Sequence, residues 1–105
     1  MKIELLFFQG CPNHEALERS LRELLGDAEF SARVELVEVS DQAAAERLRF
    51  LGSPTLRVGG HDVEQGADAR SDFGLKCRLY RSAGALSGVP PQAWVHAALA
   101  TADAA

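Results

Sequence analysis

The segment that most constrains the fold lies near the N-terminus, where an apolar run ends just before a cysteine and a helical pattern begins. Residues 2–8 are rich in Ile, Leu and Phe and predict a mostly buried strand. Pro12 suits the first turn of a helix over residues 12–25, because the N–H that proline lacks has no partner there. Cys11 is therefore expected at the N-terminus of a helix, where free amide groups and the helix dipole favour a thiolate over a thiol.

Composition places the chain among small globular proteins. Its 105 residues, 47% hydrophobic and 25% charged, predict one domain over residues 1–105. The net charge of −4 and the absence of a basic block argue against nucleic acid or an anionic membrane surface as a partner. No stretch has the pattern of a membrane span or a secretory signal, which predicts a cytoplasmic protein with reduced thiols. The two cysteines are then expected to be reactive or buried rather than joined in a structural disulfide, although they could still form a transient disulfide during turnover.

The rest of the chain alternates predicted strands with predicted helices. The stripe of the first helix that should face the core consists of Leu17, Leu21, Leu24 and Leu25. The elements expected after it are a strand over 33–39, a short helix from Ser40 or Asp41 to about Leu51, a Gly-Gly hairpin over 55–63, a surface loop over 64–74, a strand over 76–80 and a helix opened by Pro90-Pro91. Strands joined by a helix should be parallel, whereas a hairpin adds antiparallel strands. The expected class is α/β, a mixed central sheet with helices on both faces.

Three features resemble the thioredoxin-like superfamily. They are the strand followed by Gly10-Cys11-Pro12 and a helix, the Ser53-Pro54-Thr55 sequence directly before the third strand, and the order of the elements. The resemblance implies a thioredoxin-like fold in which Pro54 is cis and lies against the Cys11 sulfur. Composition alone would favour trans, because only about 5–6% of X–Pro bonds are cis, and Pro54 could simply end the preceding helix. The resemblance also implies that Ser53, Pro54 and Thr55 position an extended substrate against the sulfur.

A closer resemblance is to a group of small bacterial thioredoxin-like proteins, some labelled as selenoproteins and some as alkylmercury-lyase-like. The motifs that carry it are Gly10-Cys11-Pro12-Asn13-His14, Gly52-Ser53-Pro54-Thr55, Cys77-Arg78-Leu79-Tyr80 and Gly88-Val89-Pro90-Pro91. The chain departs from the Cys-x-x-Cys pair of thioredoxin, because His14 stands at the fourth position. A mixed disulfide at Cys11 would then need a second thiol to release it, from glutathione, a partner protein or Cys77.

Each candidate site residue has a functional and a structural interpretation. Cys11 is interpreted as a nucleophile rather than a half-buried residue without chemistry. His14 could hold a proton for the sulfur, favour the thiolate as a cation, join Cys11 as a metal ligand, or be a solvated helix residue. Strand alternation would place Cys77 and Leu79 on one face with the flanking cations on the other, which favours a buried, inert Cys77 over a resolving thiol.

Two further groups of residues receive structural interpretations. The spacing of His61, Asp62, Asp68 and Asp72 matches no metal-ligand pattern, which predicts a solvated loop. Trp94 is expected to be a packing residue.

These observations leave more than one class of function. The first is a thiol-redox protein, a thiol–disulfide oxidoreductase or a reductant of a small oxidant, with Cys11 as nucleophile, His14 as modulator and Cys77 as a candidate second thiol. It would need no cofactor, and its partner would be a protein or small-molecule thiol or disulfide. The alternative is a protein that binds Hg(II) or Cu(I), or handles organomercurials, through Cys11 and Cys77. A third is a scaffold that only binds a partner. The sequence leaves the oligomeric state open.

Overall fold

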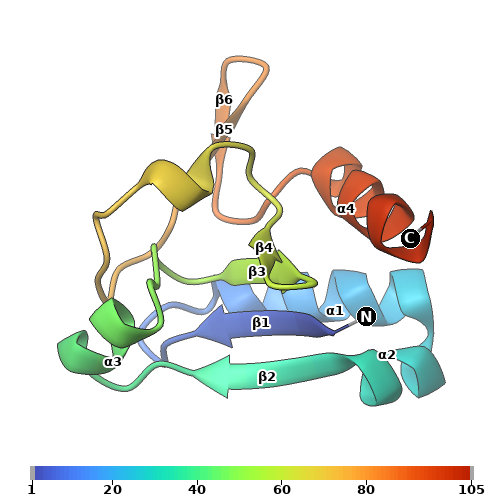
Figure 1. Cartoon of the computed structure of the whole chain (residues 1–105), viewed down its shortest axis with the longest axis horizontal. Helices are drawn as coiled ribbons and strands as arrows, with labels where there is room; N and C mark the ends of the chain where they lie inside the picture. The colour runs from blue at the N-terminus through green and yellow to red at the C-terminus, as the bar shows by residue number, and fades with distance from the viewer. Residues whose placement is uncertain (1, 105) are drawn as a thin grey trace.

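The computed structural model describes residues 2–104, and of residues 103 and 104 the backbone alone. Its centre is a four-stranded mixed sheet with the strand order β2-β1-β3-β4 (Figure 1). The strands are β1 (Ile3–Phe7), β2 (Val34–Glu38), β3 (Thr55–Val58) and β4 (His61–Asp62). β1 pairs parallel with β2 and antiparallel with β3, which in turn pairs antiparallel with β4. The mixed sheet, the parallel first pair and the Gly-Gly hairpin confirm the sequence predictions.

The described helices are α1 (Asn13–Leu25), α2 (Asp27–Arg33), α3 (Gln42–Arg47) and α4 (Gln92–Ala104). α1 ends at Gly26 as predicted, since Gly26 adopts φ 84°, which L side chains rarely adopt. Asp41 begins α3 by accepting a hydrogen bond from the amide of Ala44 at 2.8 Å. The predicted end of α3 at Leu51 is wrong, because the chain leaves the helix at Leu48.

The helix α2 was not predicted from the sequence. It has seven residues and buries one of them, Phe30. A helix that short shows too little hydrophobic periodicity to be read from the sequence.

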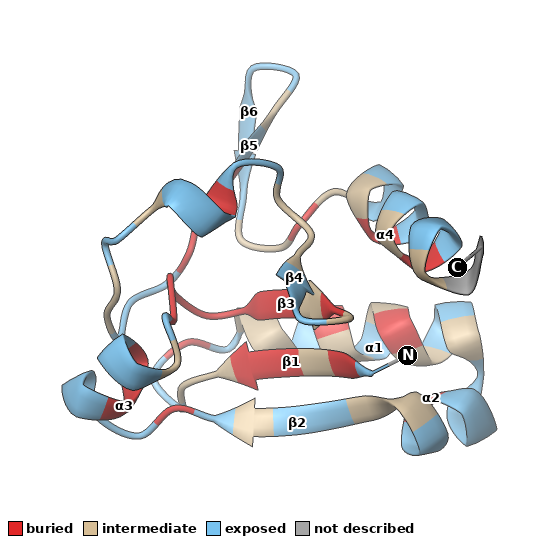
Figure 2. Ribbon diagram, in the orientation of Figure 1, coloured by how far each residue is buried: buried red, intermediate tan, exposed pale blue. Residues whose placement is uncertain are grey.

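Apolar residues pack on both faces of the sheet, as alternation along β1 requires (Figure 2). Ile3 and Leu5 face a cluster that includes α1 and α4, whereas Leu6 faces a smaller cluster that includes α3. The larger cluster consists of Ile3, Leu5, Leu17, Leu21, Phe30, Leu56, Val58, Val95 and Leu99. Within the predicted stripe of α1, Leu24 departs from the expectation, because it is 40% exposed.

The chain between β4 and α4 differs most from the prediction. The expected loop over 64–74 is present and contains a 3-10 turn, η1 (Ala67–Ala69). The predicted strand over 76–80 is wrong, since residues 76–79 make only an isolated bridge between Ser53 and Cys77, and a strand begins only at Tyr80. The following residues form a separate hairpin, β5 (Tyr80–Ser82) and β6 (Ala85–Ser87), which projects from the body of the molecule (Figure 1).

Hydropathy gives one further finding. Among the described helices, none combines the length and the apolar character that a membrane crossing requires.

Candidate redox site

The two cysteines are joined to each other. Cys11 lies directly before the N-cap residue Pro12 of α1, and it forms a disulfide with Cys77. The Cα atoms are 5.8 Å apart, within the range of about 4.4–6.8 Å that disulfides require. The structure thus brings together two of the predicted site residues that are 66 positions apart in sequence.

The two half-cystines differ in exposure. Cys11 is 0% exposed, whereas Cys77 is exposed. The prediction that Cys77 is buried is therefore wrong. Exposure alternates only over residues 77–80 and in the direction opposite to the expectation, since Arg78 is 2% exposed and Leu79 is 61% exposed. Lys76 departs from the alternation, because it is exposed like Cys77.

The predicted substrate-binding residues lie against this disulfide. The Ser53–Pro54 bond is cis, which confirms the expectation drawn from the resemblance. The Cys11 sulfur lies 3.6 Å from the carbonyl oxygen of Ser53, an oxygen to which a reduced thiol could donate a hydrogen bond. Ser53, Pro54 and Thr55 are all buried. The loop therefore forms a wall of the site beside the sulfur.

The segment of Cys77 pairs with that loop through backbone hydrogen bonds. The amide of Ser53 donates to the carbonyl of Lys76 at 2.8 Å, and the amide of Arg78 donates to the carbonyl of Ser53 at 2.9 Å. Gly52 permits this approach, because a Cβ atom there would lie 3.0 Å from both the Lys76 carbonyl oxygen and the Arg78 Cβ. Residues 76–78 thus lie where an extended substrate was expected to bind.

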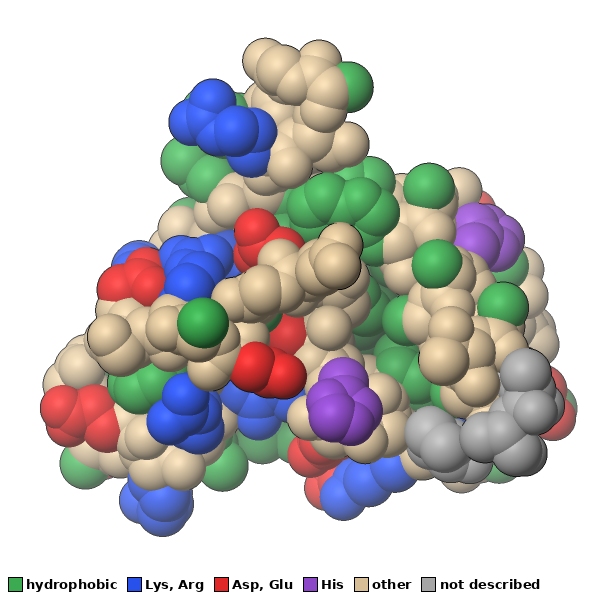
Figure 3. All heavy atoms as spheres, turned by 45° about the horizontal axis from the view of Figure 1, so that its top comes forward, with side chains coloured by type: hydrophobic (Ala, Val, Ile, Leu, Met, Phe, Trp, Pro, Cys, Tyr) green, Lys and Arg blue, Asp and Glu red, His purple; other side chains and the backbone are tan. Residues whose placement is uncertain are grey.

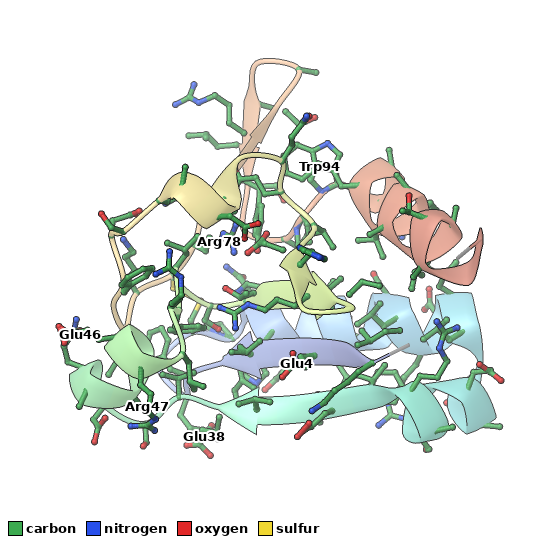
Figure 4. All side chains as sticks on the ribbon, viewed as in Figure 1. Glu4, Glu38, Glu46, Arg47, Arg78 and Trp94 are labelled. Atoms are coloured by element: carbon green, nitrogen blue, oxygen red, sulfur yellow. A yellow bond between two sulfur atoms is a disulfide. The ribbon has the colours of Figure 1, made fainter. Side chains whose placement is uncertain are left out.

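A buried ion-pair network fixes the segment from its other side. Arg78, which Figure 4 labels, donates to both carboxylate oxygens of Asp62, at 2.8 and 3.0 Å, and to Glu64 at 2.7 Å. It also donates to the hydroxyl of Thr55 at 3.0 Å, and its guanidinium lies 4.5 Å from the ring centre of Tyr80. Burial alone would lower the pKa of Arg78, but hydrogen bonds and charge from these partners, Asp62 foremost, raise it above its usual value.

Sequence analysis did not identify Arg78 as a site residue. The available signal was its position next to a cysteine, on the inward face of an alternating segment that also contains Tyr80. Of its acidic partners, Asp62 was predicted to lie in a solvated loop, and Glu64 was given no role of its own. The network depends on contacts between segments distant in sequence, which charge spacing does not reveal.

Tyr80 ties the same segment to the cis-proline loop. Its hydroxyl donates a hydrogen bond to the carbonyl oxygen of Pro54, and the residue is 0% exposed. Burial raises the pKa of the Tyr80 phenol above its usual range, against the opposing charge of Arg78. Trp94 packs edge-on to the Tyr80 ring at 6.2 Å, which confirms the packing role expected of it.

His14 lies beside the backbone of Cys11. Its Nδ1 is 2.8 Å from the carbonyl oxygen of Cys11, and its ring stacks on Phe7 with centres 4.3 Å apart. A neutral ring that donates from Nδ1 to this carbonyl leaves Nε2 as its basic nitrogen. Within the described residues, no hydrogen bond joins His14 to a sulfur. The half-buried ring is thus fixed against the start of α1 rather than fully solvated.

Further ion pairs lie on the surface near Cys77. Asp72 pairs with Arg70 at 2.6 Å and with Lys76 at 2.9 Å, and acidic and basic side chains lie next to each other on the face shown in Figure 3. Hydrogen bonds from Arg70 and Lys76 hold the pKa of Asp72 well below its usual range. Among the side chains of residues 2–102, no group of three or more His, Cys, Asp or Glu could hold a metal ion.

Comparison of the chain with protein-family models, with curated proteins and with solved structures gave no match. The chemistry must therefore be argued from the site. A disulfide beside a helix N-terminus, with one of its two cysteines exposed, can be opened by an external thiolate and reformed by oxidation.

Proposed function

We propose that this protein is a thioredoxin-like thiol–disulfide exchange protein whose redox pair is Cys11 and Cys77. The observation that carries the proposal is the disulfide between a cysteine directly before α1 and a cysteine that pairs with the cis-proline loop. The thioredoxin-like assignment is supported by the β1-α1-α2-β2 order, by the antiparallel β3 that follows Pro54, and by the final helix.

The reaction moves two electrons and two protons. Two external thiols reduce the disulfide to two cysteine thiols and become one external disulfide; the reverse reaction oxidises the pair. α1 begins without a side-chain cap, so the amide groups of its first turn favour negative charge on the Cys11 sulfur that precedes them. The protein supplies position and electrostatics, with Ser53, Pro54 and Thr55 as the wall beside the sulfur and His14 as a group that modulates it.

The setting that we propose is the reducing cytoplasm predicted from the sequence. Disulfides in such compartments are usually transient and serve catalysis or redox sensing. The exposed residue Cys77 provides the access that a reversible disulfide needs.

The test is redox equilibration followed by turnover. The protein is incubated in glutathione buffers of graded potential and the free thiols are counted by mass after alkylation; two free thiols should appear together as the potential falls.

The wild type should also catalyse reduction of a small disulfide by glutathione, and Cys11→Ser and Cys77→Ser should each abolish the two-thiol transition. His14→Ala should shift the pH profile of the reaction. His96→Ala, which replaces an exposed histidine, is its control. A pair that stays oxidised in excess reduced glutathione would contradict the proposal.

A second candidate function is capture of a thiophilic metal ion as cargo. The observation that favours it is that the fold holds two sulfurs together, and in the reduced state thiolates select soft ions such as Hg(II) and Cu(I). Reduced protein should then bind one Hg(II) per chain, measured by native mass spectrometry, and lose it when either cysteine becomes serine. Equal binding by the Cys11→Ser, Cys77→Ser double variant would exclude this candidate.

A further inference from the structure

We propose that Cys77, and not Cys11, is the sulfur that forms the mixed disulfide with an external partner, whereas Cys11 is the leaving and resolving thiol. The inference rests on the proposed thiol–disulfide exchange and assigns its two roles. It reverses the expectation from the sequence, in which the cysteine before the helix was the nucleophile.

The first observation is the difference in access. An incoming thiolate must reach a sulfur, and Cys11 is 0% exposed, whereas Cys77 and its neighbours Lys76 and Leu79 are exposed. The Cys11 sulfur is bonded to Cys77 and lies 3.6 Å from the Ser53 carbonyl oxygen. A partner that approaches the disulfide from solvent therefore meets Cys77.

The second observation is that the covering segment is anchored independently of the disulfide. The two hydrogen bonds with Ser53 and the Arg78 network hold residues 76–78 in place. When the S–S bond opens, these contacts remain, so Cys11 stays covered and Cys77 stays at the surface. Arg78 acts here as a positioning residue, since it fixes the backbone of the segment that carries the reactive sulfur.

The third observation concerns the leaving group. The external thiolate attacks the Cys77 sulfur, a new S–S bond forms to Cys77, and the electron pair of the broken bond goes to the Cys11 sulfur. A thiol with a lower pKa leaves faster, and the start of α1 stabilises charge at Cys11. The Cys11 thiolate can then either reattack Cys77 or stay reduced while a second external thiol releases the first as an external disulfide.

The experiment traps the mixed disulfide in the oxidised wild-type chain. Oxidised protein is mixed with reduced glutathione, quenched at early times with an alkylating reagent, and cleaved after glutamate. Cleavage places Cys11 in the peptide 5–15 and Cys77 in the peptide 65–105, which contains no glutamate. We expect glutathione on the second peptide and the alkyl group on the first, in at least ~10-fold excess over the reverse arrangement.

The possible outcomes separate the two proposals. Glutathione on Cys11 with alkylated Cys77 overturns the role assignment but leaves the exchange proposal standing. No mixed disulfide on either peptide, together with no reduction, overturns both.

A second measurement tests the anchoring by Arg78. In the reduced protein, Cys77 should be alkylated faster than Cys11. Arg78→Ala should lower the ratio of the Cys77 rate to the Cys11 rate, and Arg78→Lys should lower it less. The exposed control Arg81→Ala should leave this ratio unchanged. If Arg78→Lys and Arg78→Ala both keep the wild-type ratio, Arg78 does not position the sulfur.

Discussion

Two regions of the molecule are stabilised by different kinds of interaction, and each region contributes one of the two cysteines. The sheet region, residues 2–63, buries apolar side chains between strands and helices. The ion-paired region, residues 64–91, contributes few buried side chains and is fixed by Arg78, Tyr80 and surface ion pairs. Cys11 belongs to the first region and Cys77 to the second, so the disulfide joins a part fixed by apolar packing to a part fixed by charge and hydrogen bonds.

The difference explains why the two sulfurs are unequal. Apolar packing excludes water from the sheet region, where the Cys11 sulfur is enclosed. In the ion-paired region the Arg78 side chain is buried, and the adjacent Cys77 is exposed. The reactivity assigned to Cys77 thus depends on an electrostatic arrangement, and changes to that arrangement should have the largest effects.

Removal of the Arg78 side chain should have the largest effect on the ion-paired region. Arg78→Ala leaves the buried carboxylate of Asp62 without its cation and leaves Glu64 with Arg70 alone, and loss of one partner of a buried pair costs roughly 3–5 kcal/mol. Urea unfolding of the oxidised protein measures the free energy. Arg81→Ala, in the exposed hairpin, is the matched control and should change stability by less than about 0.5 kcal/mol. Equal stability of Arg78→Ala and the wild type would show that the network does not hold the region.

Reduction of the disulfide should have the next largest effect. The bond closes a loop of 66 positions, and such cross-links typically stabilise a fold by about 2–4 kcal/mol, by limiting the unfolded chain. Unfolding of wild type with and without reductant gives the difference, and the Cys11→Ser, Cys77→Ser double variant should match the reduced wild type and not respond to reductant. A double variant as stable as the oxidised protein would mean that Arg78 and Tyr80 alone suffice to join the two regions.

The same contrast sets how much the sequence could predict. In the sheet region, the strands, the helix α1, a cap at Ser40 or Asp41 and the Gly-Gly turn were readable from neighbouring residues and agree with the structure, whereas α2, the end of α3 and the exposure of Leu24 were not. In the ion-paired region, the conformation follows from Arg78 meeting Asp62, Glu64 and Thr55 from another part of the chain. Local alternation gave the correct period there but not which face points inward.

The candidate site divides in the same way. The positions of Cys11, His14 and the cis Pro54 were predictable, because they depend on a local motif and a resemblance. The disulfide partner and the exposure of Cys77 were not, because they depend on a segment anchored by long-range ion pairs.

Loss of the Tyr80 hydroxyl should have an intermediate effect. Tyr80→Phe keeps the ring against Arg78 and Trp94 but leaves the buried carbonyl of Pro54 without its donor, which costs about 1–3 kcal/mol. Trp94 is the only tryptophan, so its fluorescence follows unfolding beside the substituted ring. A Tyr80→Phe protein as stable as the wild type would show that the hydrogen bond contributes nothing net.

The smallest effect should come from the surface pairs of Asp72, and it should depend on pH. Because Arg70 and Lys76 hold the pKa of Asp72 below its unfolded value, the stabilisation is present above that value and is lost as the pH falls below about 4. The side chain is 49% exposed, so solvent screening limits the contribution to less than about 1 kcal/mol. Asp72→Asn should therefore be slightly less stable than the wild type at pH 7, and the gap should close in acid and in high salt. The control is Asp68→Asn, whose side chain is 83% exposed and lies 4.0 Å from His61. A gap between Asp72→Asn and the wild type that persists in acid would assign the effect to lost packing, and would leave Arg78 and Tyr80 as the contacts that fix the Cys77 segment.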